Sequence, residues 1–150
     1  IQDICKTTKP KCLIICNKAQ IPLGLAADEV FVVTETLMKK ISGVQHPEGF
    51  IAELAMPKNS PLTHVKKIVV ADCIQDPGNL GTLIRSSLAF GWDGMFILPG
   101  TSDPYNDKAL RAAKGATFHL PIYSGSWLDL QDILIKNNLQ LVVADVSGKS

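Results

Sequence analysis

Ile74-Gln-Asp-Pro-Gly-Asn-Leu-Gly-Thr-Leu-Ile-Arg-Ser-Ser-Leu-Ala-Phe-Gly91 is the stretch of sequence that decides the fold. It follows an apolar run, residues 68–73, that is typical of a buried parallel strand. Pro77 and Gly78 favour a tight turn, and Asn79 is then expected to cap the helix that follows. A helix that begins at the carboxyl end of a strand offers a common site for binding an anion.

The predicted helix has one face that packs on the sheet. This face carries residues at helical spacing, namely Leu80, Leu83, Ile84, Ser87 and Leu88. Arg85 lies off this face, between the small residues Gly81 and Ala89 on the same row, so its guanidinium is expected to be unobstructed. Only two of the 15 basic residues are arginines. Arg85 is therefore a candidate for bidentate recognition of a phosphate or carboxylate, and a solvated surface arginine is the alternative.

Composition indicates a globular protein. The chain has 150 residues, 46% of them hydrophobic, and no apolar run approaches the ~20 residues of a membrane span. Its net charge is +1, so any binding to a polyanion requires a local patch of cations. The four cysteines, Cys5, Cys12, Cys16 and Cys73, form no C-x-x-C pair and are expected to be reduced and buried in a reducing compartment, without a metal site.

Strands and helices alternate along the chain. Strands are predicted at residues 11–16, 29–33 and 50–56, with a helix at 35–42 between Thr34 and Gly43. A polar, proline-containing linker is expected next. The second half is predicted to contain strands at 68–73, 94–98, 118–123 and 139–145 and helices at 80–90, 106–113 and 127–137. The expected fold class is α/β, a mostly parallel sheet with helices on both faces, preceded by a small α+β domain.

A second group of candidate residues follows the strand predicted at 94–98. Lys108, Arg111 and Lys114 recur every third residue in a helix expected to end near Gly115. Such a row is often only a solvated helix face. This helix leaves the carboxyl end of its strand, however, at the same edge of the sheet as the helix of Arg85, where open α/β sheets bind ligands. Both arginines are therefore expected to lie near one edge.

Three blocks of sequence resemble one family. Asp76-Pro-Gly-Asn-Leu-Gly81, with Arg85 and Phe90-Gly91, resembles the first signature of the SpoU-type (TrmH-like) RNA ribose 2′-O-methyltransferases, in the SPOUT superfamily of knotted α/β enzymes. Lys108-Ala-Leu-Arg-Ala-Ala-Lys-Gly-Ala116, followed by Leu120-Pro121, resembles the next block of that family. His46-Pro-Glu-Gly-Phe-Ile51 resembles the end of the small N-terminal substrate-binding domain that many members carry.

The resemblance implies transfer of a methyl group from S-adenosylmethionine to a ribose 2′-hydroxyl of structured rRNA or tRNA. It assigns the catalytic roles to Asn79 and Arg85. It places the active-site turn at Asp76, Pro77 and Gly81. It assigns contacts with RNA phosphates to three cations, Lys108, Arg111 and Lys114.

The resemblance also implies a domain organisation. Residues 1–56 would be part of the RNA substrate-binding domain, 57–65 a linker, and 66–150 the N-terminal part of the methyltransferase domain. The family's later signatures, which form the knot and most of the cofactor pocket, are absent from these 150 residues. We therefore expect the cofactor-binding residues beyond Ser150 and an inactive protein if these residues stand alone. The complete protein is expected to be a cytoplasmic or organellar homodimer (chloroplast or mitochondrion), without a metal or a membrane partner.

Two other functions fit parts of the sequence. A non-catalytic RNA-binding protein would keep the cations at the edge and lack the cofactor-binding half. A Rossmann-like nucleotide-binding enzyme would use Pro77-Gly-Asn-Leu-Gly81 as its phosphate loop, although this stretch is not the G-x-G-x-x-G pattern.

Overall fold

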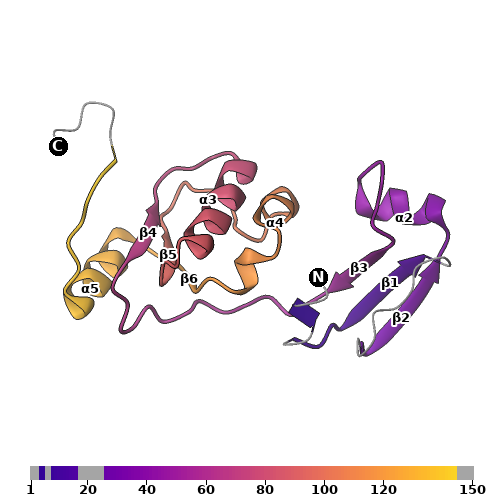
Figure 1. The fold of residues 1–150 in the computed structure, drawn as a ribbon, viewed down its shortest axis with the longest axis horizontal. Helices are drawn as coiled ribbons and strands as arrows, with labels where there is room; N and C mark the ends of the chain where they lie inside the picture. The colour runs from indigo at the N-terminus through magenta and orange to yellow at the C-terminus, as the bar shows by residue number, and fades with distance from the viewer. Residues whose placement is uncertain (1–3, 6–7, 17–25, 145–150) are drawn as a thin grey trace. The chain divides into compact units, whose positions relative to one another are not determined.

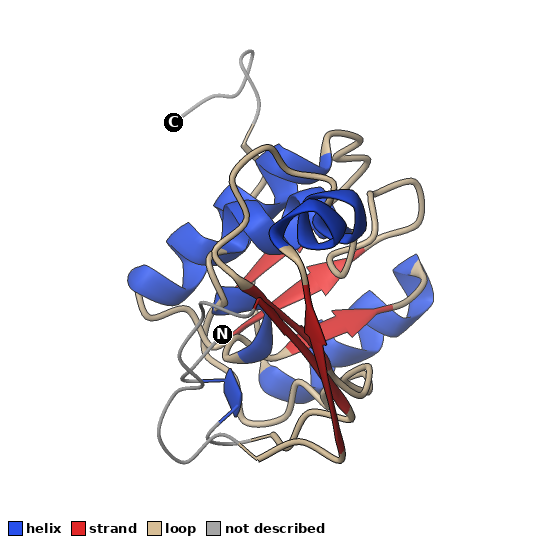
Figure 2. Cartoon of the chain, turned by 90° about the vertical axis from the view of Figure 1, so that its right-hand side faces the viewer, coloured by secondary structure: helices blue, strands red, loops and turns tan. Residues whose placement is uncertain are grey.

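The computed structural model describes residues 4–5, 8–16 and 26–144. The chain divides into two compact units, Ile1–Pro57 and Lys58–Ser150 (Figure 1). Both units contain a small sheet and at least one helix, drawn in red and blue in Figure 2. In the described part of the chain, no helix has both the length and the apolar character needed to cross a membrane.

In the residues that the structure describes, the first unit contains a three-stranded sheet and a helix that follows its second strand. Its elements are β1 (Cys12–Cys16), β2 (Glu29–Val33), α2 (Glu35–Ser42) and β3 (Phe50–Glu53). The strand order is β2-β1-β3, with β1 parallel to β2 and antiparallel to β3. The predicted helix is confirmed to the residue, because Thr34 Oγ1 accepts a hydrogen bond from Leu37 N and Gly43 ends the helix at φ +64°.

The strand predicted at 50–56 is shorter than expected. The ladder with β1 ends where Lys11 N donates to Glu53 O at 2.9 Å. Pro10 precedes Lys11 and has no N–H, so it cannot donate a further hydrogen bond to extend the ladder between β1 and β3. The core of this unit is formed by residues such as Leu13, Ile15 and Met38.

The second unit is a parallel sheet covered on both faces. Its elements are β4 (Ile68–Ala71), α3 (Pro77–Ala89), β5 (Gly94–Ile97), α4 (Asp107–Ala113), the 3₁₀ helix η1 (Ala116–Phe118), β6 (Ile122–Ser124) and α5 (Trp127–Asn137). The strands lie in the order β4-β5-β6, all parallel. The predicted fold class, an α/β sheet with helices on both faces, is confirmed.

Alternation along the strands divides the core into two layers. Met95 and Ile97 face α3 and α4, where they pack with Leu80 and Ile84. Phe96 and Leu98 face the opposite way and pack with Leu130 of α5 and with buried residues that precede β4. As predicted, the buried face of α3 is formed by Leu80, Ile84 and Ser87, with Leu83 and Leu88 partly buried.

The segment predicted as a linker packs on the second unit from Asn59 onward. The Asn59 side-chain amide pairs with both backbone groups of Ser124 at 3.0 Å, and Ser60 N donates to Ile122 O, so this segment covers the outer edge of β6. At its other end, Asn137 of α5 accepts from Val65 N at 3.1 Å and donates to the carbonyl oxygen of Leu62 at 2.9 Å. Leu62 and Val65 are buried. We call residues 59–65 the anchored segment.

Two predicted strands differ in the structure. The strand predicted at 118–123 begins only at Ile122, since residue 118 ends η1 instead of starting a strand. Lys114 and Gly115 both adopt positive φ values and turn the chain into η1, where Ala116 and Thr117 are buried. Residues 139–144 form no strand and pair with none of the strands described here. Leu141, Val142 and Val143 are exposed, consistent with the lack of a neighbouring strand. Position 145 of that prediction lies outside the described residues.

Candidate functional site

Two loops are joined at the carboxyl edge of the second sheet, after β4 and β5. Ser102 N donates to Ile74 O at 2.8 Å, and the Ser102 hydroxyl donates to the carbonyl oxygen of Gln75. Thr101 Oγ1 donates to Ala71 O at 3.1 Å. Sequence reasoning missed Thr101 and Ser102; their place directly after β5 was the available signal.

Cys73 lies in the first of these loops. It adopts φ +52° and is exposed, so the prediction that all four cysteines are buried is wrong for Cys73, although Cys5 and Cys16 are buried and Cys12 is half-buried. A hydrogen bond with Asp72, together with that group's charge, raises the pKa of the Cys73 thiol. The thiol form is therefore favoured over the reactive thiolate.

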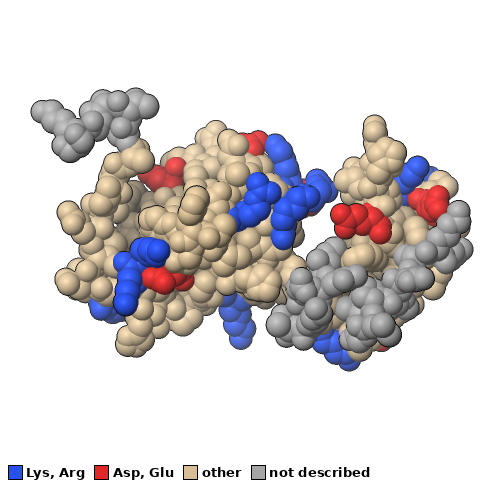
Figure 3. Space-filling model, viewed as in Figure 1, with Lys and Arg blue, Asp and Glu red and all other residues tan. Residues whose placement is uncertain are grey.

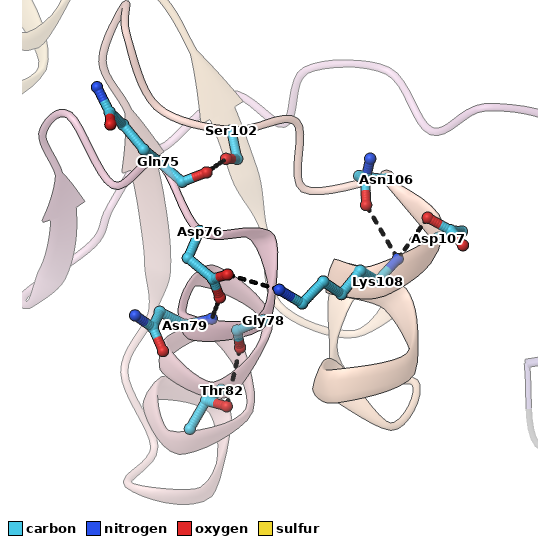
Figure 4. Close-up of polar contacts among 9 residues, drawn as sticks. All are labelled: Gln75, Asp76, Gly78, Asn79, Thr82, Ser102, Asn106, Asp107 and Lys108. Carbon is cyan, nitrogen blue, oxygen red and sulfur yellow. Dashed lines mark hydrogen bonds and ion pairs between the residues drawn. The ribbon is translucent and has the colours of Figure 1, made fainter.

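Asp76 caps α3, not Asn79 as the sequence analysis predicted. Asp76 Oδ1 accepts a hydrogen bond from Asn79 N at 2.9 Å, and Pro77 occupies the first helical turn (Figure 4). An Asp followed by Pro is the stronger start signal, because the fixed φ of Pro suits the first helical position. The Asn79 side chain is left exposed and points away from Lys108 of α4.

The Asp76 carboxylate also contacts the neighbouring helix. Its second oxygen, Oδ2, lies 2.6 Å from Lys108 Nζ (Figure 4). The hydrogen bond from Lys108, followed by that from the backbone of Asn79, lowers the pKa of the Asp76 carboxyl below its ordinary value. One carboxylate therefore connects the start of α3 with α4, an arrangement that sequence spacing did not reveal.

Gly81 packs closely against α4. A Cβ at this position would lie 2.2 Å from Ala109 O and 2.8 Å from Ala112 Cβ. Its small size therefore serves the packing of two helices, and does not simply leave space around Arg85 as the sequence analysis supposed. Arg85 follows one turn later, exposed, and no other described residue forms an ion pair or a hydrogen bond with its guanidinium.

Asn79 and Arg85 leave α3 in different directions. Six residues correspond to about 1.7 helical turns, so the two side chains point roughly 120° apart around the helix axis. The structure therefore places both on exposed parts of α3 but does not by itself bring them to one point. Their predicted catalytic roles stay predictions.

Basic side chains gather over α4, on one side of the second unit (Figure 3). Lys108 pairs with Asp76, and Arg111 Nη2 lies 2.6 Å from Asp107 Oδ2. Lys114 ends the helix at φ +52°, one residue before the predicted end at Gly115, and among the described residues its ammonium has no ion-pair partner. Two of the three predicted RNA-binding cations are thus already paired with carboxylates.

One of the alternative functions, a Rossmann-like nucleotide-binding enzyme, gains no support from this geometry. The stretch Pro77-Gly-Asn-Leu-Gly81 is the first turn of α3 and not a glycine-rich loop for a pyrophosphate. Within the ranges that the structure describes, no three His, Cys, Asp or Glu side chains gather as a metal site requires.

The fold and this edge place the second unit among α/β proteins that bind ligands at the carboxyl ends of parallel strands. Comparison with known proteins is more specific. The model of the SpoU rRNA Methylase family matches residues 66–150, which is more than half of the chain. The chain belongs to this family, and the predicted resemblance is confirmed.

Several relatives carry informative names. The chain is 33% identical over 111 residues to 23S rRNA (guanosine(2553)-2'-O)-methyltransferase RlmP of Bacillus subtilis, covering 73% of this chain and 44% of that protein. It is 29% identical over 119 residues to human mitochondrial rRNA methyltransferase 3, covering 74% of this chain and 28% of the relative. The chain thus spans less than half the length of either protein.

Solved structures show the same fold. An AdoMet-bound rRNA methyltransferase from Sinorhizobium meliloti superposes with a TM-score of 0.75 at 25% identity, covering 91% of this chain and 54% of that one. The SpoU methyltransferase AviRb from Streptomyces viridochromogenes, in complex with AdoMet, superposes with a TM-score of 0.76 at 19% identity, covering 91% and 57%.

Proposed function

We propose that this chain provides the RNA-facing part of an enzyme that transfers a methyl group from S-adenosylmethionine to a ribose 2′-hydroxyl of rRNA or tRNA. The observation that carries this proposal is the exposed guanidinium of Arg85 on α3, without a partner among the described residues, in a chain of the SpoU rRNA Methylase family. The names of the relatives support RNA as the substrate and the ribose 2′-hydroxyl as the acceptor.

Arg85 would act by positioning and by electrostatics. A ribose hydroxyl is a poor nucleophile, and a guanidinium that holds the adjacent phosphate fixes the hydroxyl for attack and stabilises the charge that develops there. A guanidinium is a poor proton acceptor, so it does not serve as the general base. The exposed amide of Asn79 would orient the sugar from another side of α3.

The described residues do not form a site that fits S-adenosylmethionine. At the carboxyl edge, the hydroxyls of Thr101 and Ser102 already donate to backbone carbonyls. A pocket of about 330 Å³ lies between α5 and residues 61–64, on the opposite face of the sheet from Arg85. When bound, this cofactor supplies an electrophilic methyl group. We assign no described residue to hold it and infer that its ligands lie outside the described residues.

RNA binding would use the cations on and after α4. Lys114 is the strongest candidate for a phosphate contact, and Arg111 would have to exchange Asp107 for phosphate.

The complete protein would be a homodimer. The relatives include bacterial and mitochondrial proteins, so we propose the cytoplasm or an organelle as its location.

The proposal is tested with Arg85→Ala and Arg85→Lys in the complete natural polypeptide, with methyl incorporation into RNA as the readout. We expect kcat to fall by roughly 10²–10³-fold in Arg85→Ala, the magnitude typical of losing one preorganised donor. Arg85→Lys should recover only part of the loss, because an ammonium cannot form the bidentate contact. Lys136→Ala on α5 is the control and should retain wild-type turnover.

Unchanged turnover in Arg85→Ala would contradict the assigned role. RNA binding without methyl transfer by the complete wild-type polypeptide would favour the non-catalytic alternative. The isolated 150 residues should methylate no RNA, and measurable methylation by them would refute our inference about the cofactor site.

A further inference from the structure

We propose that Lys108 is a positioning residue that acts through Asp76, and not a ligand of RNA phosphate. This inference rests on the proposed methyl transfer, because the residues that it positions are those on α3. It changes the role that the sequence pattern assigned to Lys108 as one of three equivalent cations.

The first observation is that the two oxygens of the Asp76 carboxylate bind different partners. Oδ1 accepts from Asn79 N at 2.9 Å and so holds the first turn of α3, while Oδ2 lies 2.6 Å from Lys108 Nζ. The ammonium is therefore already hydrogen-bonded to a charged acceptor, which strengthens the bond and fixes its geometry. An RNA phosphate would have to compete with this carboxylate for the same lysine.

The second observation is the space that Gly78 leaves for the lysine. A Cβ on Gly78 would lie 2.9 Å from Asp76 Oδ1 and 3.3 Å from Lys108 Cε. The Lys108 side chain thus reaches from α4 to the first turn of α3 (Figure 4). The sequence of that turn is compatible with this close approach because position 78 has no side chain.

The third observation is that α3 and α4 contact closely again at Gly81, one turn further along. The contact at Gly81 fixes how near the helices approach, and the bond between Asp76 and Lys108 fixes the beginning of α3 relative to α4. Together they set the position of Asn79 and Arg85 relative to Lys114 at the end of α4. The pair itself is about half exposed, at 57% for Lys108 and 45% for Asp76, so it should contribute little to global stability.

The experiment uses the complete natural polypeptide and compares Lys108→Met with Asp76→Asn. Asn remains a good N-cap, so Asp76→Asn removes the charge while keeping the capping function. We expect kcat to fall roughly tenfold in each variant, with little change in RNA affinity, because displaced groups slow chemistry more than binding. The double variant should be no slower than either single variant, and Lys108→Arg should recover most of the activity.

Two further lysines provide matched comparisons. Lys136 also pairs with an aspartate, Asp132, at 3.8 Å on the surface of α5, and Lys136→Met should leave kcat unchanged. Lys114→Met should instead weaken RNA binding and reduce the slope of log affinity against log salt by about one, which is the signature of a lost phosphate contact. Lys108→Met should leave that slope unchanged.

A second readout does not depend on activity. In ¹³C NMR titrations, the pKa of the Asp76 carboxyl should rise in Lys108→Met and also in Gly78→Ala, which displaces the lysine without removing its charge. No rise in Lys108→Met, or a salt slope reduced by one in that variant, would overturn the proposal. If the wild type transfers no methyl group, the proposed function fails, while the titration still tests the contact between Lys108 and Asp76.

Discussion

Helices α3 and α5 begin at the same edge of one sheet and pack on its opposite faces, yet they are fixed in different ways. The α5 start is self-contained, because Ser126 N donates to Asp129 Oδ2 at 2.7 Å and Asp129 N donates to Ser126 Oγ at 3.3 Å. The α3 start depends on a residue 32 positions away, since Asp76 binds Lys108. A local cap only starts a helix, whereas a shared cap also positions one helix against another.

The outward surfaces of the two helices differ as well. On α5, Leu128 and Ile135 are 74% and 78% exposed, and no role in the proposed reaction is assigned to them. On α3, the exposed side chains include Asn79 and Arg85. The helix whose position depends on a second helix is thus the one that carries the candidate catalytic groups.

Among the substitutions that test how α3 and α5 are fixed, Gly81→Ala is expected to have the largest effect on stability. The new Cβ would lie 2.2 Å from Ala109 O, a backbone atom that moves only if α4 moves, so we expect a loss of about 2–3 kcal/mol in the free energy of unfolding measured with urea. Gly78→Ala is the matched control on the same helix. Its new Cβ meets only side-chain atoms, and its cost should stay below about 1 kcal/mol. Equal costs would show that the helix contact is looser than described.

A smaller effect is expected from Asn137→Ala, which tests how α5 is fixed. The substitution removes the partners of Val65 N and of the Leu62 carbonyl oxygen, both in part-buried surroundings. Unsatisfied groups of this kind cost about 1–2 kcal/mol of stability each when buried, so we expect about 2 kcal/mol in total by urea unfolding. Lys136→Ala, on the same turn but exposed, should change stability by less than about 0.5 kcal/mol.

The two caps can be compared directly by Asp76→Ala and Ser126→Ala. Each should cost about 1 kcal/mol of stability, the usual loss for a removed N-cap. Only Asp76→Ala releases a side chain of another helix, so amide hydrogen exchange in α4 should accelerate in that variant and stay unchanged in Ser126→Ala. Acceleration in both variants would contradict the idea that only the Asp76 cap, through Lys108, holds α4 in place.

The smallest effect is expected on the stability of the folded protein at low pH. Lys108 lowers the pKa of Asp76, and hydrogen bonds from Ser126 lower the pKa of Asp129, so each folded-state pKa lies below the unfolded value. These carboxylates therefore contribute stability that is complete above about pH 4 and is lost as the pH falls through the folded-state pKa values. Urea unfolding from about pH 5 downward should show a shallower loss in Asp129→Asn than in wild type, and a parallel loss would exclude this linkage.

Local signals predicted much of this structure. The bounds of α2 and α5 were predicted to the residue, and for α2 the signals were the capping residues Thr34 and Gly43. The error at Asn79 was avoidable, since Asp76 followed by Pro77 is itself a start signal. The strand predicted at 139–145 shows a different limit, because an apolar run forms a strand only where a partner edge is present.

The candidate site was less predictable than the fold. Its residue types and their place at the carboxyl edge followed from the order of strands and helices. The pairing of Lys108 with Asp76, and the packing of Gly81 on Ala109, depend on how two helices meet, and no periodicity within either helix encodes that. Sequence spacing therefore treated Lys108, Arg111 and Lys114 as equivalent. In the structure, Lys108 pairs with Asp76 and Arg111 with Asp107, whereas Lys114 has no ion-pair partner among the described residues.

The anchored segment has a consequence for where this protein can be cut. The family match begins at residue 66, but Leu62 and Val65 are buried in the second unit, and the Asn59 amide pairs with the outermost strand. A protein that starts at residue 66 would lack the buried side chains of Leu62 and Val65. It would also expose the unpaired edge of β6, and exposed strand edges promote aggregation. Transplanting this unit between proteins should therefore use a junction before Asn59 and not at residue 66, so that the anchored segment stays with the unit that it packs on.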